Sequence, residues 1–218
     1  MNYQIILLIL ISILIISTIY IYNKKKIKYY NLIKTYIIEN NHDNTLKIEK
    51  NYNLKNINYE KIISIKNNNI DRNYLYENNI INFKNLNYND ISRFLSHIKT
   101  WEKIIEDNVK YGIILEDNIK SLDKLISDDI INNINKLPNN WNILLLNKEG
   151  AEIIKLTDEI FKVNNIISTN SYIINNITAK YLLENIFPIK KTLEKKLSDL
   201  SKNLINIYII NKNDMNIY

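Results

Sequence analysis

The segment from residue 89 to residue 118 constrains the fold most, because it predicts a helix, a short connection and a buried strand in succession. Its apolar residues have the spacing of one buried face of a helix over residues 90–107. They are Ile91, Phe94, Leu95, Ile98, Trp101, Ile104 and Ile105. An apolar strand over residues 111–115 follows, and Glu116 and Asp117 come directly after it. Ligands of open α/β sheets bind beyond the carboxyl ends of strands, so these carboxylates lie where a metal ion or a phosphate-bearing ligand would bind.

The rest of the chain alternates short apolar strands with helical stretches. We expect strands at residues 35–38, 59–65, 141–146, 161–163, 171–174 and 204–210. We expect helices at residues 45–54, 123–136, 178–187 and 192–203, and a loop or insertion at residues 66–88. Strands separated by helices predict an α/β sheet that is covered on both faces. Without an internal repeat or a second boundary, the pattern predicts a single domain.

Composition excludes several kinds of site. The chain has no cysteine, which rules out disulfides and thiolate metal sites. Its only two glycines cannot form a dinucleotide fingerprint or a P-loop. The two histidines are far apart, which argues against a histidine zinc site, and Ser96 beside His97 lacks the context of a nucleophile elbow. The net charge of +6 comes from scattered lysines, so we expect no nucleic-acid partner.

Residues 3–22, YQIILLILISILIISTIYIY, form an apolar run. About twenty such residues in a helix span roughly 30 Å, the thickness of a bilayer core. We therefore expect a retained transmembrane anchor at residues 3–22, a basic juxtamembrane linker at residues 23–32 and a single-pass membrane location. A cleaved signal peptide would need basic residues before the run and a small-residue cleavage site after it, and the sequence has neither. A buried core helix would need a polar face, which the run lacks.

Several motifs occur in a fixed order along the chain. Leu95-Ser96-His97 is followed by Trp101-Glu102 and then by the strand ending in Leu115-Glu116-Asp117. Further blocks lie at residues 137–146, 168–183 and 188–200. Together these blocks resemble glycosyltransferase family 25, which includes bacterial lipooligosaccharide galactosyltransferases and collagen hydroxylysine galactosyltransferases. The resemblance covers residues 33–213.

The chain also departs from the family pattern. It lacks the arginine that usually follows the first strand. Other family positions are replaced, namely the Gly-Cys turn by Ser92-Arg93, the third acidic residue by Asn118, Trp-Asp by Trp141-Asn142 and a later glycine by Ser168. The resemblance implies an α/β fold with a single Rossmann-like (GT-A-type) nucleotide-sugar-binding domain preceded by one transmembrane helix.

The function that this resemblance implies is glycosyl transfer. A membrane-anchored enzyme would move a hexose, galactose or glucose, from a nucleotide sugar to an acceptor hydroxyl on a glycan or a protein. A catalytically inactive relative with a binding or assembly role in a membrane is the alternative, and an unrelated membrane-tethered α/β protein is a third. Lysines after the apolar run favour a cytoplasmic domain, whereas glycan-building enzymes of the secretory pathway face the lumen, so the side of the membrane stays open.

The resemblance also implies roles for individual residues. Asp117, Glu116 and Asn118 would hold a divalent cation, Mn²⁺ or Mg²⁺, beside the diphosphate of a UDP-sugar. Asp117 and Glu194 would be catalytic, with Glu194 as a base or an acceptor contact. The donor would contact His97, Ser96, Glu116 and Tyr172. For each residue a structural role is the alternative, and the site requires Glu116, Asp117, His97 and Glu194 to converge in one cleft.

Overall fold

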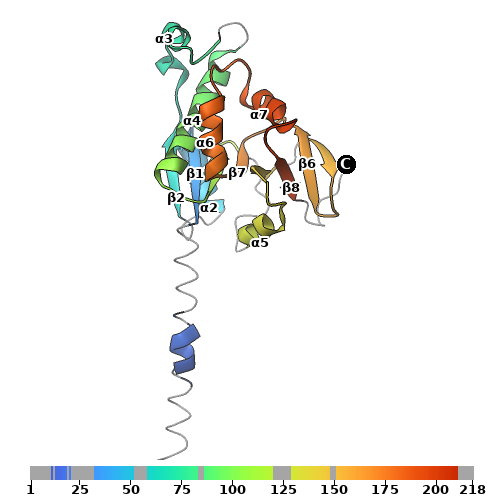
Figure 1. Cartoon of the computed structure of the whole chain (residues 1–218). Helices are drawn as coiled ribbons and strands as arrows, with labels where there is room; N and C mark the ends of the chain where they lie inside the picture. Colours follow the sequence, from blue (N-terminus) through green and yellow to red (C-terminus); the bar gives the residue numbers. More distant parts are fainter. Residues whose placement is uncertain are drawn as a thin grey trace, which may run out of the picture.

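A mixed sheet of eight strands runs through the described part of the chain, in the order β2-β1-β3-β7-β4-β8-β6-β5 (Figure 1). The computed structural model describes residues 11, 13–18, 20, 32–51, 58–82, 86–119, 129–147 and 151–210. The strands are β1 Ile33–Glu39, β2 Tyr59–Ile63, β3 Tyr111–Glu116, β4 Ile143–Leu145, β5 Glu152–Lys155, β6 Ile160–Asn165, β7 Ser171–Asn175 and β8 Ile207–Ile210. The helices are α2 His42–Asn51, α3 Arg72–Glu77, α4 Tyr88–Glu106, α5 Asp129–Lys136, α6 Asn176–Asn185 and α7 Leu193–Ser201, with a 3₁₀ turn at Asn67–Asn69.

Strand direction divides the sheet into a parallel part and an antiparallel part. β2, β1 and β3 are parallel neighbours, so their carboxyl ends meet at one edge. β7 lies between β3 and β4 and is antiparallel to both. β8 is parallel to β4, β6 is antiparallel to β8, and β5 is antiparallel to β6. This mixed α/β arrangement fits a Rossmann-like domain. The parallel edge gathers the loops that follow β1, β2 and β3.

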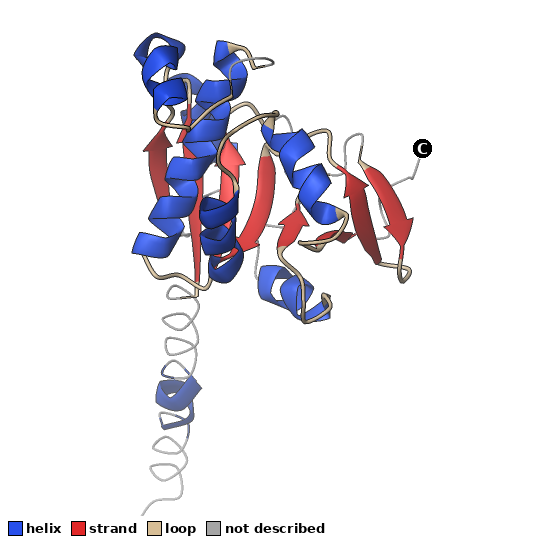
Figure 2. Cartoon of the chain, turned by 45° about the horizontal axis from the view of Figure 1, so that its top comes forward, coloured by secondary structure: helices blue, strands red, loops and turns tan. Residues whose placement is uncertain are grey.

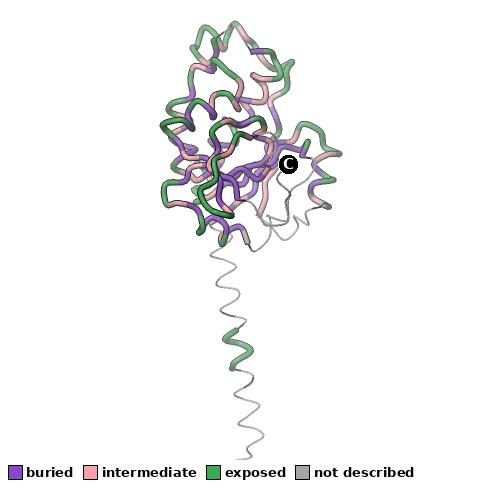
Figure 3. The backbone as a smooth tube through the Cα atoms, turned by 90° about the vertical axis from the view of Figure 1, so that its right-hand side faces the viewer, coloured by how far each residue is buried: buried purple, intermediate pink, exposed green. Residues whose placement is uncertain are grey.

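Helices pack on both faces of the sheet, as the alternation of strands and helices predicted. Figure 2 shows α4, α6 and α7 in front of the strands. Side chains along β3 point to opposite faces in turn. Ile114 packs in one apolar cluster with residues of α4, α6 and α7, whereas Ile113 and Leu115 pack in a second cluster with Ile130 and Ile134 of α5. Figure 3 shows the buried residues concentrated along the strands and the exposed residues on the outer turns and helices.

Helix α4 packs closely on β3. Its predicted apolar face is buried at Ile91, Phe94, Ile98, Trp101 and Ile104, while Leu95 and Ile105 are partly buried. Gly112 of β3 makes this approach possible, because a Cβ atom there would collide with the side chain of Ile104. The helix begins earlier than expected, since the Asn87 side chain accepts a hydrogen bond from the Asp90 amide.

Most predicted elements are confirmed, with shifted ends. The exception among the strands is β5, a four-residue strand with one half-buried and three exposed residues, whose EIIK sequence gives no burial signal. Residues 66–88 contain the 3₁₀ turn and α3 rather than loop alone. Helix α2 begins at residue 42, and residues 52–54 of the predicted helix lie outside the described residues. Residues 123–128 of the helix predicted at 123–136 also lie outside them.

The predicted single-pass membrane location is wrong. No helix among the described residues is long and apolar enough to cross a membrane. Within the predicted span at residues 3–22, the longest described stretch is residues 13–18. The rest of that span, apart from residues 11 and 20, and residues 23–31 of the predicted linker lie outside the described residues. The domain boundaries at 33 and 213 stay a prediction.

Candidate functional site

Glu116 ends β3 on the same face as Ile114, and therefore points toward α4. Its side chain is 3% exposed. The Oε1 atom accepts hydrogen bonds from His97 Nε2 at 2.9 Å and from Arg93 Nε at 2.8 Å, and Arg93 Nη2 lies 2.6 Å away. Arg93 and His97 are one helical turn apart on α4, so one helix face presents both groups to one carboxylate.

Arg93 also contacts two other elements. Its Nη1 atom forms an ion pair with Glu194 Oε1 at the start of α7, and its Nη2 atom donates to Thr169 Oγ1 at 2.8 Å. Thr169 Oγ1 in turn donates to Glu194 Oε1 at 2.9 Å. We call Arg93, Glu116, Thr169 and Glu194 the Arg93 cluster. It joins α4, β3, the loop before β7 and α7.

Charge pairing keeps both carboxylates of the Arg93 cluster ionised. Burial of Glu116 opposes ionisation, but the hydrogen bond from His97 and the charge of Arg93 outweigh it and lower its pKa from 4.5 to about 2. Burial likewise opposes ionisation of Glu194, and the Arg93 charge lowers its pKa. Burial favours the neutral form of Arg93, yet its bonds to Glu116 and Glu194 raise its pKa. The cluster therefore carries two negative charges and one positive charge at neutral pH.

A buried hydrogen-bond chain extends from Glu116 under α4. Tyr172 of β7 pairs with Ile114 of β3, which directs its side chain to the α4 face. The Tyr172 hydroxyl accepts from Trp101 Nε1 at 2.9 Å and lies 2.9 Å from His97 Nδ1. If Tyr172 donates its proton to Nδ1, His97 Nε2–H donates to Glu116 and every polar group in the chain has a partner.

Asp117 points away from the Arg93 cluster. Its carboxylate is buried, and Oδ2 accepts from the backbone amides of Asn40 at 2.6 Å and Asn41 at 2.5 Å. These residues form the loop between β1 and α2, where the Asn41 side chain also accepts from the Asp43 amide at 2.9 Å. Asp117 therefore holds the β1–α2 loop in place.

A hollow of about 480 Å³ opens beyond the carboxyl ends of β1 and β3. It is lined by Ile38, Asn40, Ile65, Lys66, Asn67, Asn68, Asn89, Ser92, Arg93, Ser96, Glu116 and Asn118. The charged groups on this wall are Lys66, Arg93 and Glu116, so positive charge predominates. Ser96 links α4 to the segment after β2, because its Oγ atom accepts a hydrogen bond from the Ile65 amide at 2.9 Å. We call this space the donor hollow.

Comparison with known protein families identifies the family of this domain. The sequence model of glycosyltransferase family 25, described as an LPS biosynthesis protein, matches residues 32–198. The chain belongs to glycosyltransferase family 25. The matched range contains the Arg93 cluster and the lining of the donor hollow, so both are parts of a family 25 glycosyltransferase domain. No curated protein matches the chain.

The family 25 domain brings together only some of the residues predicted from the sequence. Glu116 contacts both His97 and Arg93, and Arg93 is also paired with Glu194. The Tyr172 hydroxyl lies 2.9 Å from the other ring nitrogen of His97. Ser96 and Asn118 line the donor hollow, and Asn118 is exposed. Asp117 does not join them, because the chain has passed the strand end and the next side chain points the other way. The roles of all these residues stay predictions.

Two members of the Arg93 cluster escaped the sequence reasoning. Arg93 was noted only because Ser92-Arg93 replaces the Gly-Cys turn that is usual in the family. Its position one helical turn before His97 was the signal that both face the same carboxylate. Thr169 lay in the family-like block at residues 168–183, but that motif did not indicate a contact with Arg93. Its position became clear only from the fold.

The residues expected to hold Mn²⁺ or Mg²⁺ do not fit a preformed cation site. Among the described residues, no group of three or more His, Asp and Glu side chains could hold a metal ion. Glu116 Oε1 is taken by Arg93 and His97, and Asp117 Oδ2 by two amides. A divalent cation at Glu116 would also lie against the Arg93 guanidinium, which repels it. We therefore derive no catalytic step through a metal.

Proposed function

We propose that the protein transfers a hexose, galactose or glucose, from a nucleotide sugar to a hydroxyl group of a glycan or protein acceptor. Membership of family 25 gives the reaction class, glycosyl transfer. The observation that carries the proposal is that Glu116 and Arg93 line the donor hollow together, while Arg93 is also paired with Glu194. That hollow lies beyond strand carboxyl ends, where α/β sheets bind their ligands.

The lining of the donor hollow supports a nucleotide diphosphate as ligand. Its volume of about 480 Å³ lies within the ordinary range of ligand pockets, roughly 300–1,000 Å³. Lys66 and Arg93 supply positive charge for a diphosphate, and five asparagines supply amide donors and acceptors for ribose and sugar hydroxyls. Lys66 is held toward this wall, because its Nζ atom donates to the Asn40 carbonyl at 2.6 Å.

The proposed reaction breaks the bond between the sugar C1 atom and the diphosphate oxygen. The acceptor hydroxyl oxygen forms the new bond to C1, and the nucleoside diphosphate leaves with the bonding electron pair. The hydroxyl proton passes to a carboxylate, for which Glu194 is our candidate because it is the ionised and half-buried carboxylate of the Arg93 cluster. Arg93 offsets negative charge that develops on the leaving diphosphate.

A second candidate function is a glycan-binding or assembly role without catalysis. The observation that favours it is the pairing of Arg93 with both Glu116 and Glu194. A carboxylate with a lowered pKa is a weaker base, and Glu194 would have to break its ion pair with Arg93 before it could receive a proton. In that case the donor hollow would still bind a nucleotide or a sugar.

The test measures binding and hydrolysis of UDP-glucose and UDP-galactose by the full-length protein and by Glu194→Gln. We expect the unmutated protein to release UDP, and the variant to bind the donor within about threefold while turning over about 10²-fold more slowly. Glu184→Gln, at an exposed glutamate of α6, is the matched control and should retain full activity. Binding without turnover by the unmutated protein would favour the second candidate, and absence of binding would contradict both.

A further inference from the structure

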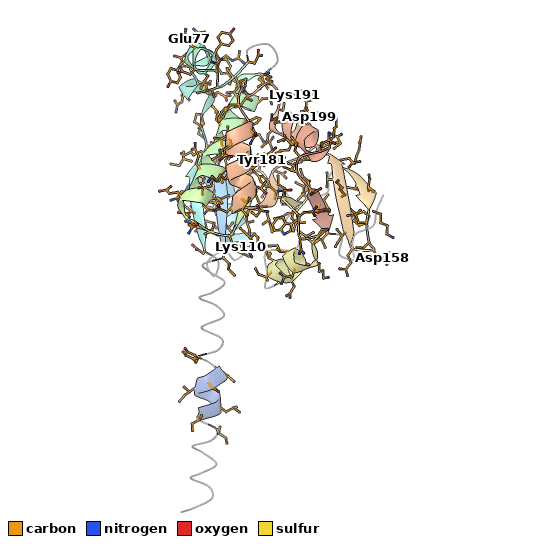
Figure 4. All side chains as sticks on the ribbon, viewed as in Figure 1. Glu77, Lys110, Asp158, Tyr181, Lys191 and Asp199 are labelled. Carbon is orange, nitrogen blue, oxygen red and sulfur yellow. The ribbon has the colours of Figure 1, made fainter. Side chains whose placement is uncertain are left out.

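A second hollow lies on the outer side of α7. It has a volume of about 830 Å³ and is bounded by α7, the segment before it and the β5–β6 hairpin. It is lined by Glu152, Asn164, Asn165, Lys190, Lys191, Thr192, Lys195, Ser198, Asp199 and Lys202. Lys191 and Asp199 can be seen near α7 at the upper part of the domain in Figure 4. We call this space the lysine hollow.

Positive charge predominates in the lysine hollow. Asp199 is already neutralised, since Oδ2 lies 2.5 Å from Lys191 Nζ and Oδ1 lies 3.6 Å from Lys202 Nζ. The hydrogen bond from Lys191 lowers the pKa of Asp199. Lys190 and Lys195 are exposed and form no ion pair with the described residues. Two uncompensated ammonium groups therefore face one remaining carboxylate, Glu152.

The helix between the two hollows presents a different side chain to each. Lys195 and Ser198 of α7, together with Lys191 just before the helix and Lys202 at its C-cap, recur every three or four residues and line the lysine hollow. Glu194, the residue next to Lys195, turns instead to Arg93 and Thr169. The start of α7 therefore contributes Lys195 to the lysine hollow and the adjacent residue, the proposed catalytic carboxylate Glu194, to the Arg93 cluster. The positive end of the α7 dipole lies at the same place.

The neighbouring surface adds an apolar part. A smaller hollow of about 350 Å³ shares Lys190, Lys191 and Asp199 with the lysine hollow and adds Phe187, Pro188 and Leu204. Phe187 is 43% exposed and Leu204 is 62% exposed. An exposed aromatic ring beside cationic groups suits a sugar that carries an anionic substituent, because the apolar face of the sugar ring can pack on Phe187.

We propose that the lysine hollow binds an anionic substituent, a phosphate or a carboxylate, of the acceptor glycan. The identification of the ligand as the acceptor rests on the proposed function, whereas the anion-binding site itself does not. Lys190 and Lys195 contact the anion, and the sugar ring packs toward Phe187. An acceptor held in this way reaches Glu194 around the start of α7. The site thus selects charged glycans over neutral ones.

The test measures the affinity of the full-length protein for glucose 6-phosphate, glucuronic acid and glucose, with the donor hollow saturated by UDP. We expect the two anionic sugars to bind at least tenfold more tightly than glucose. The double variant Lys190→Ala/Lys195→Ala should lose at least tenfold in affinity for both, and its UDP affinity should stay within twofold. Both lysines are exposed and unpaired, so thermal unfolding should be unchanged. The relative affinity for the two anions distinguishes a phosphate from a carboxylate.

The matched control is Lys47→Ala/Lys180→Ala, which removes two exposed lysines from other helices and should leave all affinities unchanged. Equal binding of glucose and the anionic sugars, or equal losses in both double variants, would overturn the inference. So would tighter binding of a short single-stranded oligonucleotide that Lys190→Ala/Lys195→Ala also weakens, since the hollow would then serve nucleic acid. Failure of UDP to bind would count against the proposed function, and the anion measurements could still be made without it.

Discussion

Arg93 of α4 forms an ion pair with Glu194 of α7, although the two residues lie 101 positions apart in the sequence. The same guanidinium binds Glu116 at the end of β3. One cation therefore fixes the positions of two carboxylates and the start of α7. The arrangement makes Arg93 the residue on which the geometry of the site depends.

Replacing Arg93 with alanine should destabilise the protein by about 2–3 kcal/mol. Glu116 is buried and would lose its charged partner, and removal of one member of a buried pair is costly. Urea denaturation measures this change. Arg93→Lys should recover less than half of the loss, because an ammonium group cannot bind Glu116, Thr169 and Glu194 in the same planar geometry. An equally large effect from Lys99→Ala, at an exposed lysine of the same helix, would contradict the explanation.

Replacing Tyr172 with phenylalanine should cost about 1–3 kcal/mol of unfolding free energy. The substitution removes only the hydroxyl group, which accepts from Trp101 Nε1 and bonds to His97 Nδ1. Both nitrogens would then be buried without partners. The control is Tyr74→Phe, at an exposed tyrosine of α3, which should change stability by less than 0.5 kcal/mol, roughly the usual limit at the surface. Equal stability of Tyr172→Phe and the unmutated protein would contradict the hydrogen-bond chain.

Stability should fall as the pH is lowered from about 5 to about 2. The pKa of Glu116 is about 2 in the folded protein, below its ordinary value of 4.5. Its contribution to stability is therefore fully present above pH 4.5 and is lost as the pH falls toward 2. The pKa of Glu194 is also lowered, and its contribution changes in the same direction. Urea denaturation across this range should show a shallower decline in Glu116→Gln than in the unmutated protein, and parallel declines would argue against the pairing.

Removal of divalent cations should change the affinity for UDP-glucose by less than twofold. We expected Mn²⁺ or Mg²⁺ at Glu116, Asp117 and Asn118, but Arg93 binds Glu116 and backbone amides bind Asp117. In our proposal the positive charges of Arg93 and Lys66 offset the negative charge of the diphosphate instead. Isothermal titration with and without EDTA measures the effect. A loss of UDP-glucose affinity of tenfold or more on chelation, restored by Mn²⁺, would contradict this prediction and show that a cation takes part in binding.

The fold was largely predictable because the apolar periodicity of this chain is clear. The continuous apolar run of β3 predicts a strand buried on both faces, and the three- to four-residue spacing in α4 predicts a helix and the face that it buries. The short strand β5 was missed, since three of its four side chains are exposed. The antiparallel insertion of β7 between β3 and β4 also has no local signature, because strand order follows from long-range pairing.

The candidate site was predictable only in part. The motif containing His97 and Glu116 marked the right edge of the sheet. It did not show that Asp117 would turn to the β1–α2 loop, because the direction of a side chain just beyond a strand depends on the amides that it meets. Nor did it show Thr169 beside Arg93, a contact between residues 76 positions apart. Such contacts depend on tertiary packing rather than on local pattern.

The most direct test of the central claim is the position of UDP bound to the full-length protein, determined by crystallography. We predict that its diphosphate lies in the donor hollow, within hydrogen-bond distance of Lys66 or Arg93 and beyond the carboxyl ends of β1 and β3. UDP bound elsewhere, for example in the lysine hollow of α7, would contradict the assignment of Glu116, Arg93 and Glu194 to the donor site.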